Sequence, residues 1–139
     1  IYGFDNIESV MPQLDINTSR IDTLKDIDLL RGVAVAVGTG LREVINYSFI
    51  PRDALEKIRY NDVSGDEILE VRKPITEDFV IMRPTLLYSL IKNAKDNINR
   101  NITDIRFFET TKTFRKIEGK ITEEQRFGII LGGEPEKYI

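Results

Sequence analysis

The segment most informative about the fold reads Glu77-Asp78-Phe79-Val80-Ile81-Met82-Arg83-Pro84-Thr85-Leu86-Leu87. Pro84 suits the first position of a helix, where its missing N–H is not needed. The apolar residues that follow recur at spacings of three and four, which predicts an amphipathic helix to about Arg100. Its expected buried stripe is Leu86, Leu87, Leu90, Ile91, Ala94 and Ile98. A strand carrying one acid, Glu109, is expected next. The sequence therefore places Arg83 at the N-terminal end of the predicted helix, next to a strand that carries an acid.

The remaining downstream segments read as further strands. We expect strands over 104–109, 112–117 and 126–131, with a turn at Glu118-Gly119. The connections between these strands are short, which implies antiparallel pairing.

Upstream, apolar residues at helical spacing predict a helix from about Ser19 to Val37, whose apolar stripe is Leu24, Ile27, Leu30, Ala34 and Val37. The valines at 33, 35 and 37 also alternate as a strand would, and helix is favoured because Gly38-Thr39-Gly40 resembles a helix C-cap. A strand is expected over 43–50, with Ile45, Tyr47 and Phe49 on one face and Pro51 as its stop. A short helix over 53–58 and a strand over 67–72 complete the pattern.

Composition limits the classes of function. The chain has 139 residues, 41% hydrophobic and 31% charged, as expected for one soluble domain. Its net charge is −3, so a strongly basic nucleic-acid surface is not expected. It contains no cysteine and no histidine, which excludes disulfides, thiolate metal sites and Ser-His or Cys-His nucleophiles. No apolar run reaches the ~18 residues expected of a transmembrane helix, so no membrane association is expected.

Five segments together resemble one known family. They are residues 1–7, 43–50, 77–87, 106–114 and 130–135. In this order and spacing they are similar to the beta subunit of bacterial phenylalanyl-tRNA synthetase. Three positions depart from the family's usual pattern: Glu8 stands where proline is usual, Leu41 where an aromatic is usual, and Thr111 where glycine is usual. The last departure concerns only a local turn or bulge.

The order of the expected elements predicts an α+β fold with helices on one face of a mostly antiparallel sheet. The resemblance implies a class II aminoacyl-tRNA synthetase-like antiparallel sheet flanked by helices, incomplete in this chain. It implies two parts: residues 1–16 as a connector from a preceding domain, and residues 17–139 as the first part of an inactive catalytic-like core. The abrupt ends of the sequence lead us to expect an excised piece of a longer protein.

The resemblance also implies a function for the intact protein, phenylalanine-tRNA ligase. An alpha subunit would be the partner, in an α2β2 assembly that uses ATP and Mg2+ to charge tRNA(Phe) in the cytoplasm. No catalytic, cofactor-binding or metal-binding residue is expected in this segment. A subunit interface is expected where the family has a helix and then a strand ending at proline, which places it at Ile45, Tyr47, Phe49 and Pro51.

Several charged residues have two interpretations. Arg106, Glu109, Lys112 and Arg115 lie where active relatives hold ATP. For Arg106 and Glu109, a cross-strand charge pair or a core-edge contact is the favoured alternative. Arg83 at the helix start suits an anion, whereas an exposed arginine or an ion pair with Glu77 or Asp78 is the commoner outcome.

A third set of charges lies on the long helix. Lys92, Lys95 and Arg100, with the nearby Asn93, Asn97, Asn99 and Asn101, suit RNA phosphates, and a solvated helix face is favoured. The rival functions for the whole chain are an active class II-type adenylate-forming ligase, a tRNA-binding module, and an unrelated α+β interaction domain.

Overall fold

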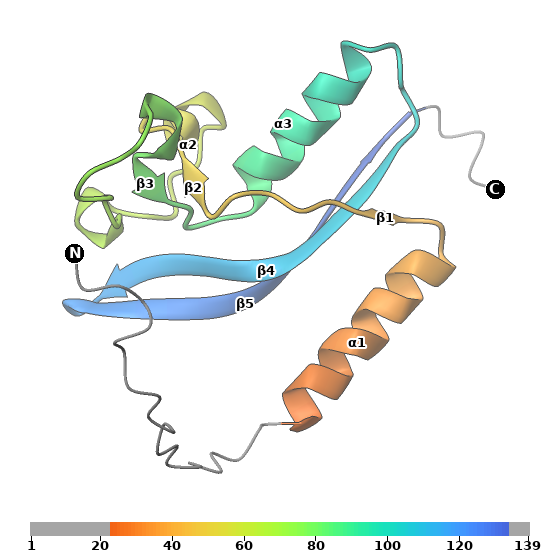
Figure 1. Ribbon diagram of the computed structural model, residues 1–139, viewed down its shortest axis with the longest axis horizontal. Coiled ribbons are helices and arrows are strands. Elements are labelled where there is room, and N and C mark those ends of the chain that lie inside the picture. Colours follow the sequence, from red (N-terminus) through yellow and green to blue (C-terminus); the bar gives the residue numbers. More distant parts are fainter. Residues whose placement is uncertain (1–22, 134–139) are drawn as a thin grey trace, which may run out of the picture.

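The computed structural model describes residues 23–133 (Figure 1), so the expected connector at 1–16 lies outside the described residues. The elements in chain order are α1 (Thr23–Gly38), β1 (Arg42–Glu43), β2 (Phe49–Ile50), α2 (Ala54–Lys57), the 3-10 turns η2 (Gly65–Glu67) and η3 (Glu77–Phe79), β3 (Ile81–Met82), α3 (Leu87–Ile98), β4 (Ile105–Ile117) and β5 (Lys120–Gly132). The mixed α+β class is therefore confirmed.

A long hairpin of β4 and β5 forms the centre of the molecule. Its antiparallel register is unbroken from the Ile105–Gly132 pair to the Ile117–Lys120 pair. Glu118 and Gly119 have φ values of 50° and 78°, and a two-residue turn with both φ positive matches the twist of a hairpin. The predicted turn is confirmed. The predicted break between 109 and 112 is wrong, because Thr110 and Thr111 pair with Phe127 and Arg126 of β5 and continue the strand. The last strand begins at Lys120, not near Arg126.

The sheet is small and not wholly antiparallel. β1 pairs with β4 in parallel, which gives the order β1-β4-β5. β2 and β3 form a separate antiparallel pair. The expected strand over 43–50 is therefore divided, since its two ends pair with different sheets and residues 44–48 run between them. The expected strand over 67–72 is reduced to a single bridge between Glu70 and Ile81.

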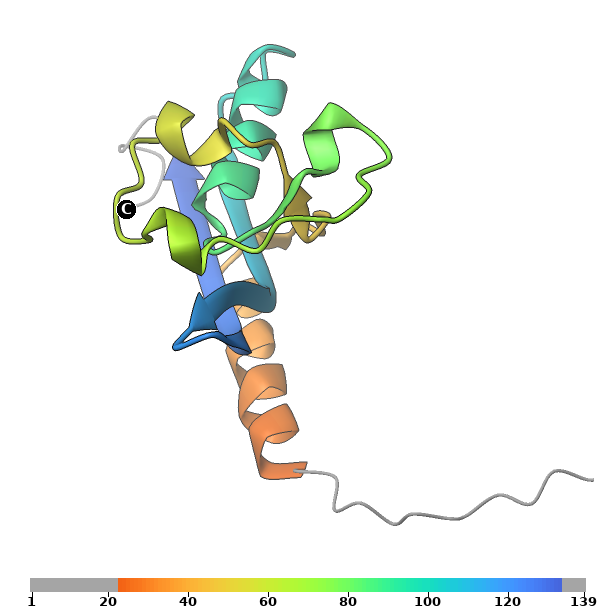
Figure 2. The same cartoon turned by 90° about the vertical axis from the view of Figure 1, so that its left-hand side faces the viewer.

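The two long helices lie on opposite sides of the hairpin (Figure 1). The face of the hairpin with Ile105, Phe107 and Ile130 packs against Ala94 of α3. Phe127 and Ile129, on the other face, line a cavity of about 390 Å3 together with residues of α1. Figure 2 shows β2, β3 and α2 gathered near α3, with α1 extending away from them. The expectation of helices on one face is wrong, because both faces of β4 carry apolar side chains that need cover.

The first helix confirms the helical interpretation of residues 33–37 but not its expected burial. Its end has a Schellman pattern, in which Gly40 at φ 86° and Leu41 donate to the carbonyls of Val37 and Ala36. Leu30 and Val37, both expected inside, are 66% and 57% exposed. Among the side chains described on α1, only Ala36 is buried. Most of the apolar surface of α1 from Ile27 to Val37 is therefore open.

A tight approach between α3 and β5 leads to the first prediction. A Cβ at Gly128 would lie 2.8 Å from Leu90 Cδ1 and 3.2 Å from Leu86 Cδ1, both on buried side chains. Gly128→Ala should therefore lower the free energy of unfolding by about 1–3 kcal/mol through overpacking. Gly32→Ala is the control, because nothing lies within 4 Å and alanine favours the helix by about 0.8–1.0 kcal/mol. Urea unfolding followed by circular dichroism should show opposite signs, and a stabilising Gly128→Ala would contradict this packing.

Candidate functional site

The extended segment between β1 and β2 displays apolar side chains to solvent. Along it, exposure alternates: Ile45 is 91% exposed and Tyr47 is 72% exposed, while Asn46 and Ser48 between them are half-buried. Phe49 is 37% exposed, and Pro51, half-buried, follows the end of β2. This alternation has the period of a strand, so one row of the segment faces outward and the other faces the core.

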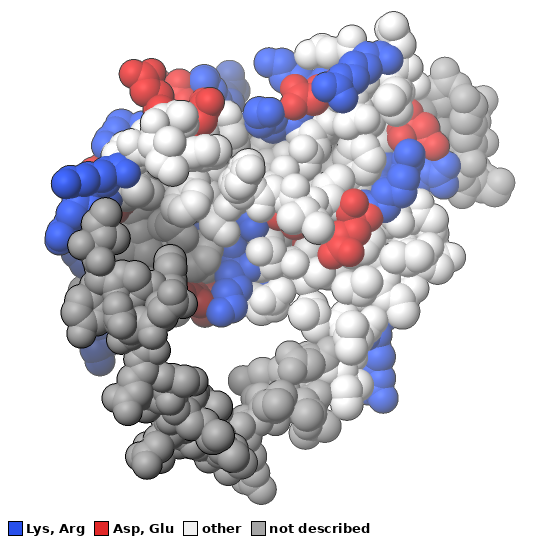
Figure 3. All heavy atoms as spheres, in the orientation of Figure 1, with Lys and Arg blue, Asp and Glu red and all other residues white. Residues whose placement is uncertain are grey.

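An aromatic cluster lies under the outward row. The Tyr47 and Phe79 rings meet edge to face with centroids 5.1 Å apart, and the Phe49 ring lies 6.0 Å from the Phe79 ring. A cavity of about 290 Å3 opens beside them, and Tyr88 and Lys92 of α3 also line it. Aromatic side chains around a cavity are typical of protein interfaces. Residues 44–48 cross the front of the molecule in Figure 1, and in the same view Figure 3 shows a broad uncharged area with charges mostly at its margins.

A fully buried ion pair lies behind this segment. Arg83 Nη1 donates to Glu109 Oε1 at 2.8 Å, and the two side chains are 0% and 3% exposed. Arg83 also donates to Thr111 Oγ1 at 2.9 Å and to the Lys112 carbonyl at 3.4 Å. The expectation of an exposed arginine, or of one paired with an acid at 77 or 78, is wrong. A charge without water needs a full set of partners, and β4 provides one.

Two asparagines extend the network to the outward segment. Asn46 Nδ2 donates to Glu109 Oε2 at 2.9 Å, and Asn93 Nδ2 donates to Asn46 Oδ1 at 3.0 Å. Asn97 Nδ2 in turn donates to the Asn93 carbonyl at 2.8 Å. The role of Asn46 was not predicted from the sequence. A lone amide between two exposed apolar residues, with amides at 93 and 97 on one helix face, was the available signal.

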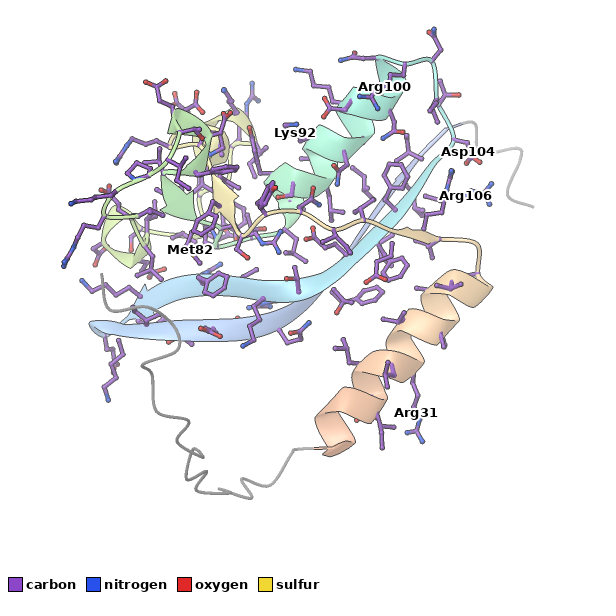
Figure 4. The ribbon with its side chains drawn as sticks, in the orientation of Figure 1. Arg31, Met82, Lys92, Arg100, Asp104 and Arg106 are labelled. Carbon is purple, nitrogen blue, oxygen red and sulfur yellow. The ribbon has the colours of Figure 1, made fainter. Side chains whose placement is uncertain are left out.

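The four residues considered for nucleotide binding do not converge. Strand alternation puts Arg106 and Lys112 on one face of β4, and Glu109 and Arg115 on the other. Each is held within the chain. Arg106 makes two hydrogen bonds with Asp104, at 2.9 and 2.6 Å, and the two residues lie together where α3 leads into β4 (Figure 4). Lys112 pairs with Glu123 at 2.7 Å. The expected pairing of Arg106 with Glu109 is wrong.

Arg115, the fourth of these residues, is held on the other side of the hairpin. Its guanidinium donates to Tyr60 Oη at 2.7 Å and to the Asp62 carbonyl at 3.2 Å. The Glu67 carboxylate lies 4.0 Å away. These contacts anchor the loop that follows α2 to β4, so this arginine has a packing role.

The charged residues of α3 point to solvent, whereas two of its amides do not. Lys92 lies midway along α3 and Arg100 lies just beyond its end at Ile98, and both side chains are exposed (Figure 4). Lys92 pairs with Asp96 at 2.9 Å, and this hydrogen bond lowers the pKa of the Asp96 carboxyl below its ordinary value. Asn93 and Asn97 turn inward to the network. The expected exposed polar face therefore excludes these two asparagines.

Among residues 23–133, no three acidic side chains gather in a way that would hold a metal ion. In the same part of the chain, none of the helices combines the length and the apolar character needed to cross a bilayer.

Comparison with known families decides where the chain belongs. Residues 7–138 match the family model for the phenylalanyl tRNA synthetase beta chain CLM domain. The chain belongs to this family. Over its full length, this CLM domain is 45% identical to the phenylalanine–tRNA ligase beta subunit of Fusobacterium nucleatum subsp. nucleatum. It is 34% identical to the corresponding subunit of Syntrophus aciditrophicus. It spans only 17% and 18% of the lengths of these relatives.

Solved structures show that this CLM domain shares its fold with class II synthetases. It superposes on a pyrrolysyl tRNA synthetase of Desulfitobacterium hafniense with a TM-score of 0.61 and 19% identity, covering 80% of this chain and 38% of that one. A histidine–tRNA ligase subunit from Alicyclobacillus acidocaldarius gives a TM-score of 0.62 at 18% identity, covering 88% and 36%. At these identities the likeness concerns the fold.

Proposed function

We propose that this CLM domain is a non-catalytic structural part of a phenylalanine–tRNA ligase beta subunit, and that it supports assembly with the alpha subunit. The intact protein would attach phenylalanine to tRNA(Phe) in the cytoplasm, using ATP and Mg2+ bound outside this segment. The observation that carries the proposal is the outward apolar row at Ile45, Tyr47 and Phe49. Obligate interfaces are apolar, and an exposed apolar surface on a folded domain indicates a partner.

The charged residues support the non-catalytic part of this proposal. A nucleotide site needs guanidinium groups converging on one phosphate position. Here Arg106 and Arg115 point to opposite faces of β4 and are both held by neighbouring residues. Glu109 is the one acidic residue of β4, and its carboxylate forms an ion pair with Arg83 inside the core.

The first test mixes the 139-residue chain with a bacterial phenylalanyl-tRNA synthetase alpha subunit and measures the mass by size-exclusion chromatography with light scattering. Co-elution without ATP binding by the chain alone is the expected result. ATP binding by the chain alone would overturn the non-catalytic part. Failure to co-elute, with a folded chain by circular dichroism, would overturn the assembly part.

A single substitution tests the position of the interface. Tyr47→Asp places a carboxylate in the outward row and should weaken the complex at least about 30-fold, the effect of losing a hot spot worth 2 kcal/mol or more. Ile121→Asp is the matched control, since Ile121 is 69% exposed and lies on the hairpin, away from the row. Calorimetric titration with the alpha subunit should separate the two variants. Equal weakening by both would place the interface elsewhere.

A further inference from the structure

The outward row has few backbone attachments of its own. Val44 N donates to the Phe108 carbonyl at 2.8 Å, and the Ser48 carbonyl accepts from Arg83 N at 2.9 Å. In the described part of the chain, no backbone hydrogen bond is recorded for the three residues between them. Ile45 and Tyr47, which carry most of the exposed apolar surface, therefore lie on a span held at its two ends.

The side chain of Asn46 is the attachment in the middle of that span. The Glu109 carboxylate accepts from Arg83 on one oxygen, and the Asn46 NH2 group is the donor that faces its other oxygen. The Asn46 oxygen then points the other way and accepts from Asn93 on α3. Chemistry therefore allows one orientation of this amide. Because the Asn46 side chain points inward to these partners, alternation along the extended segment turns residues 45 and 47 outward.

The anchor of this chain of hydrogen bonds is rigid. Glu109 is 2% exposed, and its other oxygen is held by the fully buried Arg83. Arg83 is fixed in turn by Thr111 and by a backbone bond from Phe114 N to its own carbonyl, 3.0 Å. Asn46 therefore links the outward row to rigid, buried residues of the core.

We propose that Asn46 and Asn93 are positioning residues for partner binding, and that they hold Ile45 and Tyr47 in the orientation that the partner recognises. The proposal rests on the proposed function for its partner, an apolar surface of the alpha subunit. The ordering of Tyr47 by Asn46 and Asn93 does not require the partner, so it is expected in the free chain as well. Rigid presentation lowers the entropic cost of association, so loosening the row should weaken binding without removing any contact atom.

The test compares Asn93→Ala with Thr111→Val. Each substitution removes one hydrogen-bond partner from the network, and both residues are half-buried. They differ in their partner, because Asn93 donates to Asn46 whereas Thr111 accepts from Arg83. Both should shift the urea midpoint by similar amounts. Asn93→Ala should weaken binding of the alpha subunit about tenfold, the equivalent of 1.4 kcal/mol, and Thr111→Val should leave it within about twofold, a difference of under 0.5 kcal/mol.

A second readout needs no partner. Fluorotyrosine incorporated into the chain gives a 19F signal for Tyr47, assigned by its loss in Tyr47→Phe. In Asn93→Ala this signal should narrow and move toward its unfolded position as the contact with Phe79 loosens, while in Thr111→Val it should stay. Equal binding and equal spectra in the two variants would overturn the positioning role. A loosened Tyr47 in a chain whose wild type binds no alpha subunit would uphold positioning and overturn the proposed function.

Discussion

Replacing Arg83 by methionine is expected to lower the free energy of unfolding by about 3–5 kcal/mol, the effect of breaking a buried ion pair on one side. The substitution leaves the Glu109 carboxylate, 2% exposed, with Asn46 as its remaining partner. It also removes the donors to Thr111 Oγ1 and the Lys112 carbonyl. Small domains are stable by about 5–15 kcal/mol, so this single change removes a large share of the total. Urea unfolding by circular dichroism measures it.

A second substitution distinguishes loss of the pair from loss of packing. Arg83→Met combined with Glu109→Gln removes both charges while Gln keeps an acceptor for Asn46. The double variant should be more stable than the sum of the single effects predicts, by about 2 kcal/mol, within the range measured for contacting residues. Additive losses would mean that the two charges do not depend on each other.

Arg52→Met is the exposed counterpart. Arg52 pairs with Glu70, and its guanidinium lowers the pKa of the Glu70 carboxyl by hydrogen bonding. Both side chains are more than half exposed, so water replaces the lost partner. The change in stability should stay within about 0–1 kcal/mol, as for other surface pairs.

Phe108→Ala is the other large expected effect, a loss of about 3–5 kcal/mol through an unfilled cavity. Phe108 is 0% exposed and its ring stacks on Phe127 with centroids 5.4 Å apart. It belongs to the face of the hairpin that lines the α1 cavity through Phe127 and Ile129. Removing this ring leaves a cavity beneath Phe127 on that face of the hairpin. Guanidinium unfolding by circular dichroism measures the loss.

Phe127→Ala is the matched control for this prediction. It removes the other ring of the stacked pair, but Phe127 is 43% exposed and loses less contact with the core. The expected loss is closer to the typical point-mutant value of about 1 kcal/mol. If Phe127→Ala costs as much as Phe108→Ala, the stack rather than burial holds this face together.

Some elements follow from local sequence because their causes are local. The turn at Glu118-Gly119 and the helix end at Gly40 depend on backbone conformations available to a few neighbouring residues. The continuity of β4 through Thr110 and Thr111 does not, because it depends on the strand opposite, which pairs residue by residue across the whole length.

The outward apolar row follows in part from the sequence, while its role as a subunit interface stays a prediction. Ile45, Tyr47 and Phe49 share one face of an extended segment, which the alternation in the sequence indicates directly. Their outward direction is decided by Asn46, whose partners Asn93 and Glu109 lie 47 and 63 residues further along the chain. No local pattern indicates that pairing.

Patterns in the sequence predict the α+β class, the turn at Glu118-Gly119 and the two long helices, and five ordered segments indicate the family, but the uninterrupted length of β4 and β5 was not predicted. The tertiary structure alone decided that Arg83 is buried against Glu109 rather than paired with a nearer acid, that α1 and α3 take opposite faces of the hairpin, and that the apolar side of α1 stays open. The reason is physical: periodicity fixes which side chains of an element share a face, but what covers that face is set by residues distant in the chain.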